Sequence, residues 1–207
     1  MKALLPFTMC FLMASCHSRM DDYNREWSQE DKNRLIADLT TSIAELQQDV
    51  ALLTDKQWYW KPDTATWSIA MVVEHLITHD ELFYREVQVL TALPEMPVVS
   101  SQHFSDDDTI LSYREITPQN RGTAPAYLQP LGRWCSKADA MQSYGRVRQA
   151  LIQLVEGTNK DLRKYYTSSG RGPTKYRDLH QLLLISVAHT QRHHKQILEI
   201  ASAFPPQ

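Results

Sequence analysis

The sequence predicts an all-α protein, a four-helix bundle with a long crossover between the second and third helices. Four stretches repeat apolar residues at steps of three and four, which is the pattern of amphipathic helices. The 207 residues include only six glycines and ten prolines, a composition that leaves room for long helices. No strand-like alternation, internal repeat or low-complexity tract competes with this interpretation. We expect one bundle domain over residues 28–203.

The first helix is expected to begin at Ser28. The segment Ser28-Gln-Glu-Asp31 has the form of a capping box, in which two polar side chains accept hydrogen bonds from early backbone N–H groups. The apolar stripe that follows consists of Leu35, Leu39, Ile43, Leu46, Val50 and Leu53. Thr54-Asp-Lys ends the pattern. Trp58, Trp60 and Pro62, with Asp63-Thr64, are interpreted as a connector whose tryptophans cover the end of the bundle.

The second helix is expected to begin at Thr66 or Ser68, either of which can cap it, and to run to about Leu90. Its stripe comprises Ile69, Val72, Val73, Leu76, Phe83, Val87 and Leu90, with His75 and His79 on or beside it. From Pro94 to Arg133, prolines, an acidic run and scattered aromatics replace the periodic pattern. A connection of this length is a crossover, and it allows the helices on either side to run parallel.

The third helix is expected to begin at the cap in Ser136-Lys-Ala-Asp139. Its apolar stripe is Met141, Val147, Leu151, Leu154, Val155 and Leu162. The segment Ser168-Ser-Gly-Arg-Gly-Pro173 breaks the pattern. A fourth helix then runs from Leu179 to Ile200 and carries His189 and His193.

The charge balance favours small molecules or proteins as partners. Lys and Arg number 22 against 24 Asp and Glu, so the net charge of -2 offers no field that would attract nucleic acid. The three cysteines, Cys10, Cys16 and Cys135, are too few and too scattered for a disulfide framework or a thiolate zinc site. We expect a small-molecule substrate and no nucleic acid. A homodimer is a further option, because bundles of this kind commonly pair through a helix face.

Residues 1–16 have the shape of a signal peptide, with one lysine before an apolar run that ends in small residues. The run is too short to span a bilayer comfortably. Leu12-Met-Ala-Ser-Cys16 resembles a bacterial lipoprotein cleavage box, although Met13 stands where that box normally has leucine. We expect an exported protein, periplasmic or anchored to the membrane through a lipid on Cys16, with residues 17–27 as a spacer. A cytoplasmic protein is the alternative.

Histidines on two helices form the candidate metal site. His189 and His193 are four residues apart, so their imidazoles lie on one helix face and can reach a single ion. A third ligand must come from another helix, and the second helix offers His75 or His79. The helical phases of these two differ by only about forty degrees. Periodicity alone leaves that choice open.

Three neutral imidazoles on Zn²⁺, Ni²⁺ or a related ion leave a coordination position open to water, which is the arrangement of a catalytic site. The plainer alternative is that an i, i+4 pair arises by chance among eight histidines, and that these side chains are hydrogen-bonded core residues. His194 projects about a quarter-turn from His193, and His180 lies further away, so neither is expected to share the ion.

Five short motifs occur in the order that is typical of a known family. They are Leu53-Thr-Asp-Lys-Gln-Trp58, Trp60-Lys-Pro-Asp63, Thr66-Trp-Ser-Ile69, Glu74-His-Leu76 and His189-x-x-x-His193-x-x-Gln196-Ile197. In these motifs the chain resembles the DinB/YfiT-like superfamily over most of its length after about residue 28. The resemblance implies a four-helix bundle and a metal centre of three histidines, often zinc or nickel. Carried over position by position, it gives His75, His189 and His193 as ligands.

The resemblance also narrows the function. The wider superfamily includes thiol-dependent S-transferases and isomerases, and proteins described as metal-dependent hydrolases. It therefore implies a hydrolase or a thiol S-transferase that acts on a small molecule through a three-histidine metal centre. The leader departs from the usual cytoplasmic members, which argues against transferring a thiol cofactor that is kept inside the cell. A non-catalytic metal-binding or ligand-binding bundle is the alternative.

Overall fold

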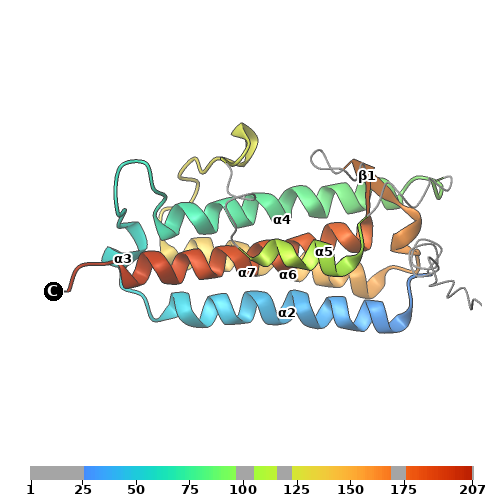
Figure 1. Ribbon diagram of the computed structural model, residues 1–207, viewed down its shortest axis with the longest axis horizontal. Coiled ribbons are helices and arrows are strands. Elements are labelled where there is room, and N and C mark those ends of the chain that lie inside the picture. Colours follow the sequence, from blue (N-terminus) through green and yellow to red (C-terminus); the bar gives the residue numbers. More distant parts are fainter. Residues whose placement is uncertain (1–25, 97–104, 116–122, 169–175, 207) are drawn as a thin grey trace, which may run out of the picture.

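Four long helices dominate the computed structural model, which describes residues 26–96, 105–115, 123–168 and 176–206 (Figure 1). They are α2 (Gln29–Ala51), α4 (Ile69–Thr91), α6 (Lys137–Gly157) and α7 (Leu179–Ser202). The predicted leader, with Cys16, and nearly all of the predicted spacer lie outside the described residues. Among the helices that are described, none combines the length and the apolar character needed to cross a membrane.

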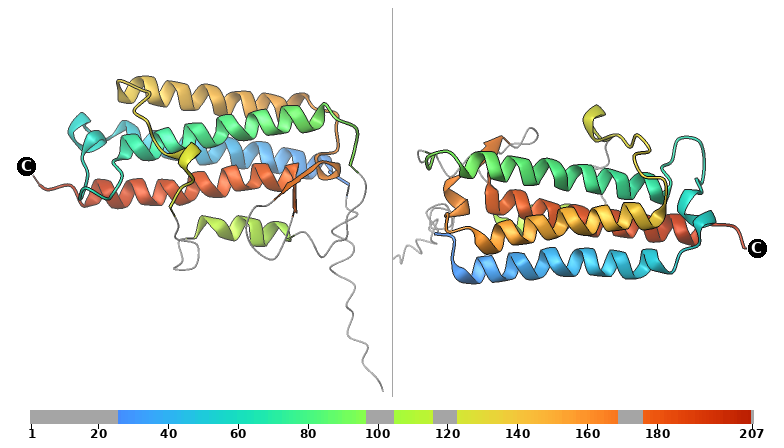
Figure 2. Two further views of the ribbon diagram at one scale, coloured as in Figure 1. Left: turned by 90° about the horizontal axis from the view of Figure 1, so that it is seen from above. Right: turned by 180° about the vertical axis from the view of Figure 1, so that it is seen from behind.

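The four helices form a bundle in which α2 and α4 each pack against both α6 and α7. Followed by colour, α2 and α7 run in one direction and α4 and α6 in the other (Figures 1 and 2). Because α4 and α6 are parallel neighbours, the chain must return along the bundle between them. The predicted four-helix bundle with a long crossover is confirmed.

Polar side chains start each long helix. Ser28 and Asp31 form the predicted capping box at α2, each side chain accepting from the other's backbone N–H. Ser68 caps α4, which settles the choice between Thr66 and Ser68, and Ser136 caps α6. Asp178 caps α7 by accepting a hydrogen bond from the third backbone N–H of the helix.

The connector after α2 is partly helical, contrary to the prediction. Helix α3 (Asp55–Tyr59) begins at Thr54, which forms a second capping box with Gln57. This Thr-x-x-Gln signal is present in the sequence but is followed by only one helical turn. Trp58 is 1% exposed and packs into the core at the end of the bundle, as predicted for a tryptophan there.

The segment between α6 and α7 differs from the prediction in two ways: Leu162 was expected in the third helix, and no strands were expected. Leu162 lies outside the third helix, in the 3-10 turn η4 (Leu162–Lys164), because α6 ends at Gly157. Strands β1 (Tyr166–Ser168) and β2 (Tyr176–Asp178) pair antiparallel across the predicted break. At three residues each, these strands are too short to show a period of two in the sequence.

The crossover contributes three short helical turns that lie against the bundle. Helix α5 (Asp107–Leu111) and the turn η2 (Ser112–Arg114) run along α7, and η3 (Ala126–Leu128) lies against α4. Figure 2 shows α5 outside the four-helix layer, next to α7. The crossover therefore covers the side of the bundle where α4 meets α7.

A buried polar layer divides the core into two apolar clusters. One cluster surrounds Leu35 and Leu183, and the other surrounds Leu46 and Leu76. Between them, every long helix contributes at least one buried polar side chain to the layer: Ser42, Asp80, Tyr144, Arg148, Ser186 and Thr190.

Candidate metal centre

Three imidazoles meet where α4 packs against α7. His75 comes from α4 and His189 and His193 from successive turns of α7, and one ring nitrogen of each lies within 4.8 Å of the others. The Nε2 atom of His189 is 3.2 Å from Nε2 of His75 and 3.0 Å from Nε2 of His193. With metal–nitrogen bonds of about 2.0–2.1 Å, two ligand nitrogens are about 3.0 Å apart at a right angle and about 3.3 Å apart at the tetrahedral angle. Two of the three separations therefore match ligands of one divalent ion, and the third pair, His75 and His193, lies within 4.8 Å.

Hydrogen bonds on the far sides of two rings direct their lone pairs inward. Nδ1 of His75 is 2.9 Å from the Leu128 carbonyl oxygen, and Nδ1 of His193 is 2.7 Å from Oε1 of Gln196. Because these oxygens only accept, each Nδ1 carries the proton and each Nε2 is left with a free lone pair. This is the tautomer that a metal ligand needs, with the outer hydrogen bond fixing the ring.

Burial keeps all three rings neutral. It lowers the pKa of His75 to about 4, although the hydrogen bond to Leu128 opposes the shift. It lowers the pKa of His193 to about 3. Burial, followed by the neighbouring histidines, also places the pKa of His189 well below its ordinary value. At neutral pH the cluster therefore presents lone pairs rather than protons to a cation.

These lowered pKa values predict that the metal-free protein loses stability in acid. A histidine near pKa 6.5 in the unfolded chain takes up its proton on unfolding, so its contribution is present above pH 6.5 and is lost as the pH falls toward 4. Each such group contributes about 1.4 kcal/mol per pH unit. Between pH 6.5 and 5, the free energy of unfolding should fall by roughly 4 kcal/mol, as measured by urea titration with a chelator present.

The variant His193→Asn is the control for this pH dependence. It removes one of the three titrating histidines, so the part of the slope that the histidines contribute should become shallower by about a third. Asp178 acts in the opposite direction, because burial raises its pKa to about 6, but it is one group against three. A wild-type slope no steeper than that of the variant would contradict the expectation.

His79 lies one helical turn beyond His75 but outside the converging group. Its ring centroid is 4.0 Å from that of His189 and 4.1 Å from that of Phe83, so it packs beside the cluster. The geometry brings together the three histidines that the family resemblance implied, and it leaves His79 as their neighbour. That these three bind a metal remains a prediction.

The buried carboxylate of Glu74 fixes the loop that orients His75. Its oxygens accept from the backbone N–H groups of Leu131 and Gly132 at 2.8 Å and of Arg133 at 3.3 Å. Gly132 has φ +76°, a left-handed conformation that favours glycine. Since the same loop carries the Leu128 carbonyl, Glu74 acts on the His75 ring through the loop rather than by contact.

Glu74→Gln is therefore expected to weaken metal binding without unfolding the bundle. The amide offers one acceptor oxygen and points an NH₂ group at backbone donors, so the loop and the Leu128 carbonyl lose their fixed position. Loss of an outer-shell hydrogen bond typically reduces metal affinity roughly 10–100-fold. Competition with a chromogenic chelator measures this.

Glu81→Gln is the matched control for this substitution. Glu81 lies on the same helix and accepts from the Arg133 side chain at 2.9 Å, but no bond joins it to the loop backbone. It should bind metal as the wild type does. Equal losses in the two variants would show that Glu74 acts through general charge rather than through the loop.

Tyr113 and Arg192 cover the outer side of the cluster. The Tyr113 ring stacks over His189 at 6.1 Å between centroids, and the Arg192 guanidinium lies 5.2 Å from the centre of the Tyr113 ring. Sequence reasoning missed Tyr113 and Leu128, because the crossover that carries them has no periodic pattern. Gln196 belongs to the closing motif, and the structure shows that its side chain accepts from the His193 ring.

His194 and His180 contact other residues. His194 lies 2.7 Å from a carboxylate oxygen of Asp49. His180 accepts from Trp27 Nε1 at 3.0 Å and lies 3.6 Å from Asp107. Neither belongs to the converging group.

The comparisons with known proteins agree with this architecture. The DinB superfamily model matches residues 38–197. A similar solved structure is that of YfiT from Bacillus subtilis, described as a probable metal-dependent hydrolase with an unusual four-helix bundle topology. The two chains share 17% identity with a TM-score of 0.57, and the match covers 84% of this chain and 88% of that one. At that identity the likeness shows the fold alone, and no curated protein matches the chain. Because the family model spans most of the sequence, the chain belongs to the DinB superfamily.

Proposed function

We propose that His75, His189 and His193 hold a divalent ion, zinc or nickel, and that the protein is a metal-dependent hydrolase of a small molecule. The observation that carries the proposal is the convergence of three Nε2 atoms on neutral imidazoles, with those of His75 and His193 lying 3.2 and 3.0 Å from that of His189. When bound, the ion would supply Lewis-acid chemistry, lowering the pKa of water or polarising a carbonyl or phosphoryl group. Three ligands leave room for that chemistry, whereas a structural zinc site uses four.

The surrounding residues suit such a role. The ligands are neutral, so the charge of the ion is not cancelled by the protein, and the converging group contains no carboxylate in the described part of the chain. The rings of Trp67, 5.1 Å from His75, and Tyr113, over His189, shield the cluster from solvent. A shielded ion polarises a bound group more strongly than one in bulk water.

A thiol S-transferase is the second candidate for the same site. A cationic centre with only neutral ligands also favours a thiolate, which brings the negative charge that the protein does not supply. The two candidates differ in the acceptor of the transferred group, which is water in one case and a thiol in the other. Turnover that needs an added thiol would favour the transferase.

Elemental analysis of native protein, followed by removal and return of the metal, tests the proposal. We expect about one zinc or nickel ion per chain and hydrolysis of one class among ester, amide and phosphoester substrates. Turnover should disappear on chelation and return with the ion. Turnover that survives complete removal of the metal would refute the hydrolase, and one ion per chain without turnover would favour a binding module.

A further inference from the structure

Arg177 differs in its contacts from two well-shielded arginines of the structure, Arg148 and Arg163. Arg148 binds Asp80, and Arg163 lies among three carboxylates, those of Asp31, Asp107 and Asp178. Arg177 on β2 is partly buried, yet in the part of the chain that the structure describes its guanidinium forms no hydrogen bond or ion pair. Shielded guanidinium groups normally have an anionic partner, because removing the charge from water is costly.

The groups around Arg177 compensate its charge only in part. Burial lowers the pKa of Arg177, and the neighbours that oppose this shift are Tyr113 and Glu86. The Glu86 carboxylate accepts a hydrogen bond from Thr167, the residue opposite Arg177 in the hairpin. No hydrogen bond or ion pair joins Glu86 to Arg177 among the described residues, so the guanidinium donors of Arg177 remain available to a ligand.

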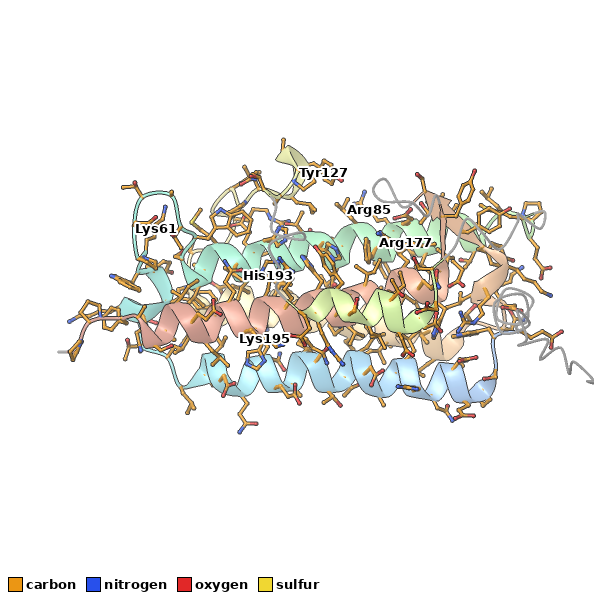
Figure 3. All side chains as sticks on the ribbon, viewed as in Figure 1. Lys61, Arg85, Tyr127, Arg177, His193 and Lys195 are labelled. Atoms are coloured by element: carbon orange, nitrogen blue, oxygen red, sulfur yellow. The ribbon has the colours of Figure 1, made fainter. Side chains whose placement is uncertain are left out.

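Arg177 lies on the same side of the bundle as the metal centre. In Figure 3, Arg177 and His193 both lie between the ribbons of α4 and α7. Tyr113 links the two places, because it is a near neighbour of Arg177 and stacks on His189. On α4, the rings of His79 and Phe83 fall between the level of His75 and the level of Glu86, which are about 16 Å apart along the helix.

We propose that Arg177 is a specificity-determining residue that binds an anionic group of the substrate, a carboxylate or phosphate at the end remote from the metal. The inference rests on the proposed function, since the reacting end of that substrate would lie at the three histidines. The planar guanidinium can donate two parallel hydrogen bonds to such a group. The aromatic rings between the two sites suit an apolar spacer. The expected substrate is thus elongated, with its reacting bond at one end and a negative charge at the other.

Hydroxamic acids test the inference, because the hydroxamate group binds zinc and nickel without knowledge of the substrate. The probes are linear alkyl hydroxamates of increasing length that end in a carboxylate or a phosphate, each paired with the same chain ending in a primary amide. Calorimetric titration of the metal-loaded protein should show at least a tenfold preference for the anionic end at one chain length.

Arg177→Gln should reduce that preference to within twofold, with the metal content and the affinity for the amide probe unchanged. Arg177→Lys should keep part of it, because the charge remains but the paired donors do not. Arg85→Gln is the matched control, since Arg85 is exposed on α4 and lines the groove between α4 and α6 instead. It should bind every probe as the wild type does.

A second readout separates ligand binding from a structural role. Arg177→Gln removes a partly buried charge that forms no ion pair, so its melting temperature should be equal to or above that of the wild type, whereas Arg163→Gln should melt lower. Equal affinities for both ends in the wild type, or a preference that survives Arg177→Gln, would overturn this inference alone. Failure of the wild type to bind metal would overturn the proposed function, and this inference with it.

Discussion

Replacing Arg148 with methionine should lower the free energy of unfolding by about 3–5 kcal/mol, the cost of breaking a buried ion pair from one side. Arg148 and Asp80 are each 1% exposed, and Nε and Nη2 of the arginine lie 2.9 Å from the same carboxylate oxygen. Burial alone would raise the pKa of Asp80, but the Arg148 charge helps to hold it below its ordinary value. The variant therefore leaves an ionised carboxylate in the core, and urea unfolding at pH 7 measures the loss.

The effect should be large because Arg148 joins all four long helices. Its Nη2 atom donates to Thr190 at 2.7 Å and to Tyr144 at 3.1 Å, and Nη1 donates to Ser42 at 3.3 Å. Methionine fills a similar volume but donates nothing, so these hydroxyl groups lose a donor in a region closed to water. The fold itself should survive, because the apolar clusters on either side of the layer are intact.

Three further variants identify the source of this loss: Arg146→Met, Asp80→Asn alone, and Asp80→Asn combined with Arg148→Met. Arg146→Met changes an exposed arginine on the same helix and should alter stability by less than about 0.5 kcal/mol. Asp80→Asn combined with Arg148→Met should recover a substantial part of the loss, because no uncompensated charge remains buried. If the double variant were as unstable as the sum of the single variants, lost packing rather than the charge would explain the result.

The long helices were predictable because local chemistry and burial agree along them. At Ser28, Ser68 and Ser136 the cap precedes an apolar stripe that reaches the core. The exception is the face of α6. Counting apolar residues gave a stripe through Met141 and Val147, whereas the fully buried face includes Tyr144 and Arg148, because this helix supplies polar groups to the central layer. Hydrophobic periodicity cannot predict the buried face of a helix when a charged residue such as Arg148 lies at the centre of that face.

The metal centre was predictable only in part, for a different reason. Side chains on a helix have a fixed spacing, so the pair of His189 and His193 is visible in the sequence. The Leu128 oxygen that orients His75 belongs to the backbone, and every residue type has such an oxygen. Its position depends on the path of the crossover, which Glu74 fixes by bonds to backbone N–H groups. Hydrogen bonds to backbone atoms, such as these, cannot be predicted from the residue types in the sequence.

Single substitutions of the histidines should divide them into ligands and neighbours. Changing His75, His189 or His193 to asparagine should reduce zinc or nickel affinity by more than the roughly 10–100-fold that an outer hydrogen bond is worth. The loss should be largest at His189, because its Nε2 atom is the shared neighbour of the other two. Elemental analysis after dialysis, with competition titrations for weakened sites, measures the series.

His79→Asn and His194→Asn are the controls, and His79→Asn is the more stringent of the two. It shares a helix with His75 and lies near the centre of the stripe, so periodicity favours it at least as much as His75. In the structure its ring packs 4.0 Å from His189 between centroids, but it is not part of the converging group. Its loss should therefore remove packing while metal is retained at about one ion per chain. If His79→Asn emptied the site and His75→Asn did not, the ligand set would be His79, His189 and His193, and the carbonyl of Leu128 would have no role in metal binding.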